Sequence, residues 1–113
     1  MDMDQWDRQF ALNARSAALG LRAVLPGMVA RGGGRAVAVG TRVALRPFAG
    51  ASAYAASKAA VIALVGAASE EVKGDGVCVN AILPSVIDTP ANRAANPDAD
   101  PGKWVRPEEI GAV

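Results

Sequence analysis

The chain has no histidine among its 113 residues and only one cysteine, Cys78. Catalytic triads that depend on histidine and zinc sites with histidine ligands are therefore excluded. A single cysteine also excludes an internal disulfide and a cysteine cluster for a metal ion. Any proton transfer that these residues perform must use other side chains.

Aromatic residues and net charge are also scarce, at 4% of the sequence and +1 respectively. A nearly neutral chain offers no strong field for nucleic acid or an anionic membrane surface. No uninterrupted apolar run approaches a membrane span, and the acidic start Met1–Asp4 differs from a basic signal peptide. We therefore predict a cytoplasmic protein with no nucleic-acid partner and no membrane partner.

Apolar residues make up 51% of the chain, enough to build a core, and their spacing predicts a helix over residues 4–31. Asp4 is the expected N-cap, and Pro26 is expected to bend the helix or end its regular part early. Gly32-Gly33-Gly34 then stops it. The apolar stripe comprises Trp6, Phe10, Ala14, Ala17, Leu21, Val24 and Met28.

Two short valine-rich runs, residues 35–41 and 77–83, predict strands buried on both faces, and Cys78 is expected in the core. Between them, Ser52 is a plausible N-cap for a helix over residues 53–73 that is apolar on nearly every side. Residues 85–107 hold four of the seven prolines and predict a long loop with at most one short helical turn.

A further helix is expected to begin at Pro107, so the elements alternate as helix, strand, helix, strand and loop. This order is typical of an α/β fold with a doubly wound parallel sheet and helices on both faces. Such sheets usually have about six strands, and only two are present here. We therefore predict that residues 1–113 form one part of a larger α/β domain.

Tyr54 and Lys58 are four residues apart and share one face of the predicted second helix. A phenol ordinarily has a pKa of ~10, and a nearby ammonium group lowers this pKa by stabilising the phenolate. Such a pair can give a proton to a carbonyl oxygen or take one from an alcohol. The alternative is a surface lysine one turn from a packed tyrosine.

Two other polar residues stand at positions that favour a site. Thr41 ends the first predicted strand, where groups of an open α/β sheet face a ligand crevice, although its hydroxyl could instead bond its own backbone. Asn13 lies mid-helix beside the apolar stripe, which indicates a held water or a local helix distortion. Its alternative is an ordinary polar position at the stripe's edge.

The run Tyr54-Ala55-Ala56-Ser57-Lys58-Ala59-Ala60-Val61 resembles the active-site helix of short-chain dehydrogenases/reductases. Asn13 with residues 25–28 resembles the preceding helix of that family, and residues 77–84 resemble its next strand and cofactor loop. The likeness covers the whole chain but only the second half of a family domain. It implies a partial Rossmann-like fold that lacks its N-terminal strands.

The resemblance also implies roles in an NAD(P)-dependent oxidoreductase that transfers a hydride to or from a carbonyl or imine-type substrate. Tyr54 would be the general acid/base, and Lys58 would lower its pKa and bind the nicotinamide ribose. Asn13 would hold a relay water. Thr41 stands where the family usually has serine.

The cofactor, NAD or NADP, would contact Pro84, Ile87 and Thr89 as well as Tyr54 and Lys58. Residues 83–104 resemble the matching loop of dihydropteridine reductases. The resemblance further implies a homo-oligomer formed through the two long helices.

The family's glycine-rich phosphate turn, which joins a strand to a helix, has no counterpart in these residues. Gly32-Gly33-Gly34 and Gly74-Asp75-Gly76 each follow a helix and precede a strand, the reverse of the required order. We therefore expect a truncated enzyme that is inactive alone and self-associates through the open edge of its first strand. The alternative is a non-catalytic remnant that serves as a helix-mediated oligomerisation module.

Overall fold

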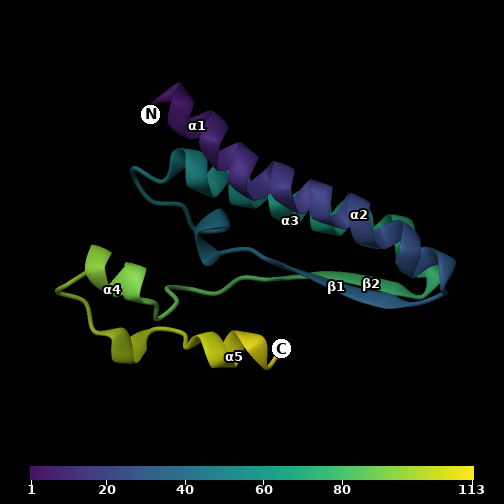
Figure 1. Cartoon of the computed structure of the whole chain (residues 1–113). Helices are drawn as coiled ribbons and strands as arrows, with labels where there is room; N and C mark the ends of the chain where they lie inside the picture. The colour runs from purple at the N-terminus through teal and green to yellow at the C-terminus, as the bar shows by residue number, and fades with distance from the viewer.

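The computed structural model describes all 113 residues and places the long helices on one side of a two-stranded sheet (Figure 1). The helices are α1 (Met3–Gln9), α2 (Ser16–Ala30), α3 (Ser52–Val72), α4 (Pro90–Ala95) and α5 (Pro107–Gly111), and the strands are β1 (Gly34–Val39) and β2 (Val77–Ile82). A π-helical segment, Phe10–Arg15, joins α1 to α2 in one long rod. The predicted partial α/β fold is confirmed.

The first rod begins and ends close to the predicted bounds, but Asp4 is not its N-cap and Pro26 does not end it early. Asp2 is the N-cap, and its carboxylate accepts a hydrogen bond from the backbone of Asp4 at 3.0 Å. The helix also continues through Pro26 to Ala30. Leu25 and Val29, on either side of this proline, pack against the core, and this contact holds the last turn in place.

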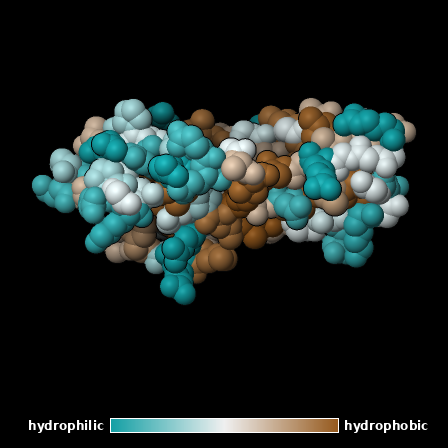
Figure 2. Space-filling view, turned by 90° about the horizontal axis from the view of Figure 1, so that it is seen from below, coloured by the Kyte–Doolittle hydropathy of each residue, from teal (hydrophilic) through white to brown (hydrophobic).

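Strands β1 and β2 are parallel, in a register that runs from Gly34 opposite Val77 to Val39 opposite Ile82. Burial alternates along β1, because α2 and α3 cover only one face of the sheet. The prediction of strands buried on both faces is therefore wrong for these residues. Val37, which points away from the helices, is 54% exposed. Figure 2, seen from the opposite side, shows hydrophobic residues across the middle of the molecule.

Cys78 also lies on this uncovered face and is exposed, so its predicted place in the core is wrong. Its neighbours along β2, Val77 and Val79, point to the helices and are each 2% exposed. The pleat reverses side chains at every residue, and composition alone does not say which face a helix covers.

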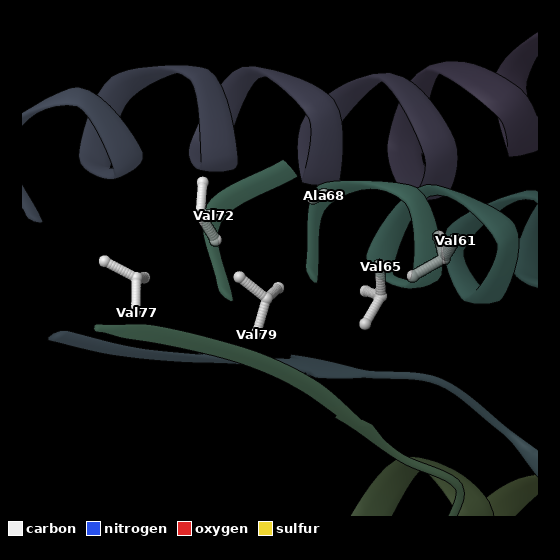
Figure 3. Close-up of a cluster of buried hydrophobic side chains, with 6 residues drawn as sticks. All are labelled: Val61, Val65, Ala68, Val72, Val77 and Val79. Atoms are coloured by element: carbon white, nitrogen blue, oxygen red, sulfur yellow. The ribbon is translucent and has the colours of Figure 1, made fainter. Parts of the chain in front are cut away.

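The core lies between α3 and β2, where four residues of the helix meet Val77 and Val79 (Figure 3). The helical members are Val61, Val65, Ala68 and Val72. Helix α3 packs on β2 and against the rod formed by α1, the π-helical segment and α2. Residues Ser52–Asp75 are long and apolar enough to cross a membrane by composition, but here this segment supplies most of the core.

Helix α3 starts one residue earlier than predicted, with Ala51 at the N-cap position and no side chain capping it. Ser52 is therefore the first helical residue and not the cap. The first strand also ends earlier, at Val39, because the chain turns at Thr41 into a short 3₁₀ helix, Arg42–Ala44.

Residues 85–107 are more ordered than the predicted loop. They contain α4 and a 3₁₀ turn, Pro101–Lys103, and Ile87 pairs with Val105 in a parallel bridge. The bridge includes a 2.7 Å hydrogen bond from the Asp88 backbone to the Val105 carbonyl. Three of the four prolines here, Pro90, Pro101 and Pro107, begin short helices, because each occupies a first-turn position that needs no donor. Pro97 lies in a turn.

Candidate active site

A depression of about 610 Å³ lies beyond the carboxyl ends of β1 and β2, and it brings four of the predicted site residues together. Thr41 comes from the turn after β1, Tyr54 from the first turn of α3, and Pro84 and Ile87 from the segment after β2. Tyr54 is 37% exposed, so its phenol can meet a small molecule in this hollow.

Lys58 lies one turn further along α3 but lines a different hollow, a groove of about 520 Å³ along the free edge of β1. Its ammonium donates a 2.9 Å hydrogen bond to the carbonyl of Val39, the last residue of β1. Partial burial lowers the pKa of Lys58 below its ordinary value, because desolvation disfavours the charged form. The ammonium is thus anchored to the end of the strand.

Asn13 lies in the π-helical segment, so the expected helix distortion is present at this residue. Its side-chain amide donates to Gln9 and to the hydroxyl of Ser57, each at 2.9 Å. Asn13 lines the same groove as Lys58. The Asn13 side chain therefore links the first rod to α3 by a hydrogen bond.

Ser57 is fully buried and connects the two hollows. Its hydroxyl accepts the bond from Asn13 and donates a 2.9 Å bond to the backbone carbonyl of Tyr54. Both hydrogen-bonding functions of the hydroxyl are thus occupied within the protein. This residue locks the relative position of the first turn of α3 and the π-helical segment.

The buried Thr41 hydroxyl oxygen accepts a 3.3 Å hydrogen bond from the backbone of Val43, so it caps the following 3₁₀ helix. The predicted alternative, a threonine bonded to its own backbone, therefore holds for the acceptor function. The hydroxyl proton remains available for a ligand. The next residue, Arg42, donates its backbone N–H to the Pro84 carbonyl at 3.2 Å, which joins the two segments that build the depression.

Thr89 does not line the depression, in contrast to Pro84 and Ile87. Its hydroxyl oxygen accepts a 3.1 Å bond from the Asn92 backbone and caps α4. Beside it, Arg93 binds both carboxylate oxygens of Asp88, at 2.6 and 2.9 Å. These hydrogen bonds hold the pKa of Asp88 below its usual value and fasten α4 to the preceding segment.

The sequence pattern assigned no role to Ser57, Arg42 or Arg46. In the structure the two arginines line the depression, and Ser57 bonds to Asn13 and to the backbone of Tyr54. Ser57 is a polar residue within a nearly continuous apolar run, and this was the available signal. The two arginines had no such signal, because an exposed arginine in a loop is the common case.

The comparisons with known proteins show the family of the chain and its fold. The model of the family described as short chain dehydrogenase matches residues 1–100. A 2-(R)-hydroxypropyl-CoM dehydrogenase from Xanthobacter autotrophicus is 40% identical over 88 residues, which cover 78% of this chain and 35% of that protein. The 3-oxoacyl-acyl-carrier-protein reductase FabG of Vibrio harveyi is 36% identical over 98 residues, covering 87% and 40%.

Solved structures show the same backbone. A protein from Beutenbergia cavernae, proposed to be an NAD(P) dependent gluconate 5-dehydrogenase and crystallised with NADP at low occupancy, superimposes with a TM-score of 0.88 at 29% identity. The match covers 97% of this chain and 48% of that one. An acetoin dehydrogenase from Enterobacter cloacae gives a TM-score of 0.85 at 30% identity, covering 99% and 46%.

The chain belongs to the short chain dehydrogenase family, whose members are oxidoreductases that use NAD(P). It spans less than half the length of these relatives. The predicted family and the predicted Rossmann-like class are therefore confirmed.

Proposed function

We propose that the protein that carries this chain is an NAD(P)-dependent oxidoreductase acting on a small carbonyl or imine-type substrate in the cytoplasm. The observation that carries the proposal is the position of Tyr54. Its side chain lines one depression with Thr41 and Pro84, at the carboxyl ends of two parallel strands, where open α/β sheets bind ligands.

The described residues fit one side of a nicotinamide cofactor. Pro84 and Ile87 present apolar surface to the depression beside the Tyr54 phenol, as a flat ring requires. The phosphate side is not found here, because no glycine turn in the chain leads from a strand into a helix. The Thr89 hydroxyl could contact the cofactor only as a hydrogen-bond donor, because its oxygen accepts the bond that caps α4.

When bound, a reduced nicotinamide supplies the hydride for the carbonyl carbon. Tyr54 gives its phenolic proton to the carbonyl oxygen, and the phenolate then recovers a proton from solvent. The Thr41 hydroxyl donates a hydrogen bond to the same oxygen and holds it near the phenol. Lys58 uses one of its three ammonium donors for the Val39 carbonyl; with the others it would bind the ribose of the cofactor and supply positive charge one turn from Tyr54. Asn13 would hold a relay water in the groove that it shares with Lys58.

The test is a Tyr54→Phe substitution in the complete protein, assayed by oxidation of NADH and NADPH with a panel of small ketones. We expect turnover to fall by about 10²- to 10⁴-fold, the usual contribution of a general acid, with cofactor affinity retained. Ser52→Ala, at the exposed start of the same helix, is the matched control and should keep wild-type turnover. Unchanged turnover of Tyr54→Phe would refute the assignment.

Residues 1–113 alone are proposed to be inactive and to bind neither NADH nor NADPH tightly. A fluorescence titration of this polypeptide checks the point, and tight binding of either nucleotide would contradict it.

A second candidate function is helix-mediated self-association without catalysis. It is favoured by apolar side chains that remain exposed on the first rod, among them Leu12 at 58% and Leu19 at 48%. Surface of this kind is typical of an interface. Light scattering of the complete protein and of a Leu12→Lys/Leu19→Lys variant tests it, and a wild-type monomer would exclude it.

A further inference from the structure

We propose that the substrate carries an oxyanion, such as a carboxylate or sulfonate, which Arg42 and Arg46 bind beside the Tyr54 phenol. This inference rests on the proposed function and adds the chemical class of the substrate. It starts from the charge of the 610 Å³ depression.

The two arginines are the only charged residues that line this depression, and no aspartate or glutamate faces it. The backbone N–H of Arg46 donates to the Arg42 carbonyl at 3.0 Å, so the residues lie one helical turn apart. The start of the turn is fixed by the Thr41 cap and by the hydrogen bond from the Arg42 backbone N–H to the Pro84 carbonyl. Two guanidinium groups are thus presented from one anchored turn.

Neither guanidinium takes part in any of the three ion pairs of the chain. Two other cations lie nearby and are engaged: Arg93 is paired with both oxygens of Asp88, and the Lys58 ammonium donates to the Val39 carbonyl. The amide groups of Asn92 and Asn96 are also engaged, since they donate to the carbonyls of Ile87 and Asn92. The strong donors left for a ligand are therefore the two guanidinium groups.

Guanidinium groups prefer planar or tetrahedral oxyanions, which accept two parallel hydrogen bonds from each fork. Like charges one turn apart repel each other, and a bound anion relieves that repulsion. The apolar part of a substrate would meet Val86 and Ile87, which line the same hollow. A short oxo acid or oxo sulfonate combines these features with a carbonyl for Tyr54.

A phosphate group of the cofactor is the alternative ligand for Arg42 and Arg46, because it is also an oxyanion. The experiment separates the two. Initial rates with NADH and NADPH are measured for the complete protein with two isosteric pairs, acetoacetate against acetylacetone and levulinate against acetonylacetone. The variant is Arg42→Gln/Arg46→Gln, and Arg8→Gln, on the exposed end of α1, is the matched control.

We expect kcat/KM for at least one oxo acid to exceed that of its neutral isostere by about tenfold or more, as a charge-assisted hydrogen bond allows. In the double variant this preference should disappear, while the rate with the diketone and the affinity for both cofactors stay unchanged. Arg8→Gln should keep the preference. Equal rates for both members of each pair, or a double variant that weakens only cofactor binding, would overturn the inference while the proposed function stands.

If no carbonyl compound is reduced, the proposed function fails, and binding then decides the inference by itself. Backbone amide resonances of residues 41–46 are followed by NMR during titration with acetoacetate and with acetylacetone. Shifts that occur only with acetoacetate and vanish in the double variant support the oxyanion site. Absence of such shifts refutes it.

Discussion

The hydroxyl of Ser57 joins α3 to the π-helical segment, and its removal should cost more than an ordinary serine substitution in the same helix. Ser57 is fully buried and makes two hydrogen bonds of 2.9 Å, one with the Asn13 amide and one with the Tyr54 carbonyl. Each such bond contributes a net ~0.5–1.5 kcal/mol. Ser57→Ala should therefore lower the free energy of unfolding by about 1–3 kcal/mol.

The assay is urea denaturation of the chain followed by circular dichroism. Ser69→Ala is the matched control, because Ser69 lies on the same helix and makes no side-chain hydrogen bond in the structure. Its effect should remain within about 0.5 kcal/mol. A Ser57→Ala midpoint equal to that of Ser69→Ala would refute the reasoning.

A double-mutant cycle with Asn13→Ala isolates the contact between the two segments. The coupling energy should be about 0.5–1.5 kcal/mol, since one hydrogen bond is shared by the pair. Additive effects of the two substitutions would show that the contact contributes nothing to stability.

Three further predictions concern other parts of the chain. Gly76→Ala should destabilise by about 2 kcal/mol or more, because Gly76 has φ +75° and a Cβ would lie 2.6 Å from the Gly32 carbonyl oxygen. Gly66→Ala, in open space within α3, should instead stabilise by about 0.5–1 kcal/mol. A raised denaturation midpoint for Gly76→Ala, or a lowered one for Gly66→Ala, would contradict the respective prediction. The Cys78 thiol should react with an alkylating reagent in the native state, and protection equal to that of a core thiol would show that the uncovered sheet face is occupied. The pKa of Lys58 is lower in the folded state, so the unfolded state binds more protons between that pKa and the ordinary lysine value. As pH rises through this window, the wild type should therefore gain stability relative to Lys58→Met. A loss of relative stability, measured by urea denaturation, would refute the argument.

Local pattern was sufficient to predict most of the elements. Apolar spacing located the first rod and α3 within one or two residues, and the valine runs located both strands. These features depend on neighbours in the chain, because helical and strand periodicities are read over a few residues. The run of residues from Tyr54 to Val61 also resembled the active-site helix of the family that the family model then showed.

Contacts between distant segments were decided by tertiary packing. Cys78 faces outward because helices cover one face of the sheet only, which an alternating strand does not reveal. Pro26 stays within α2 because the side chains beside it pack on the core. Residues 85–107 gain order through the pairing of Ile87 with Val105, two residues far apart in sequence.

The candidate site divides in the same way. The residue types proposed for proton transfer could be read from the chain, because their chemistry belongs to the side chains themselves. Their grouping could not, since Tyr54 meets Thr41 and Pro84 only where two strand ends come together. The three-dimensional structure was also needed to find the buried Ser57 hydrogen bonds and the unpaired Arg42 and Arg46. Burial and the absence of an ion-pair partner depend on residues that are close in space, and the sequence does not specify which residues these are.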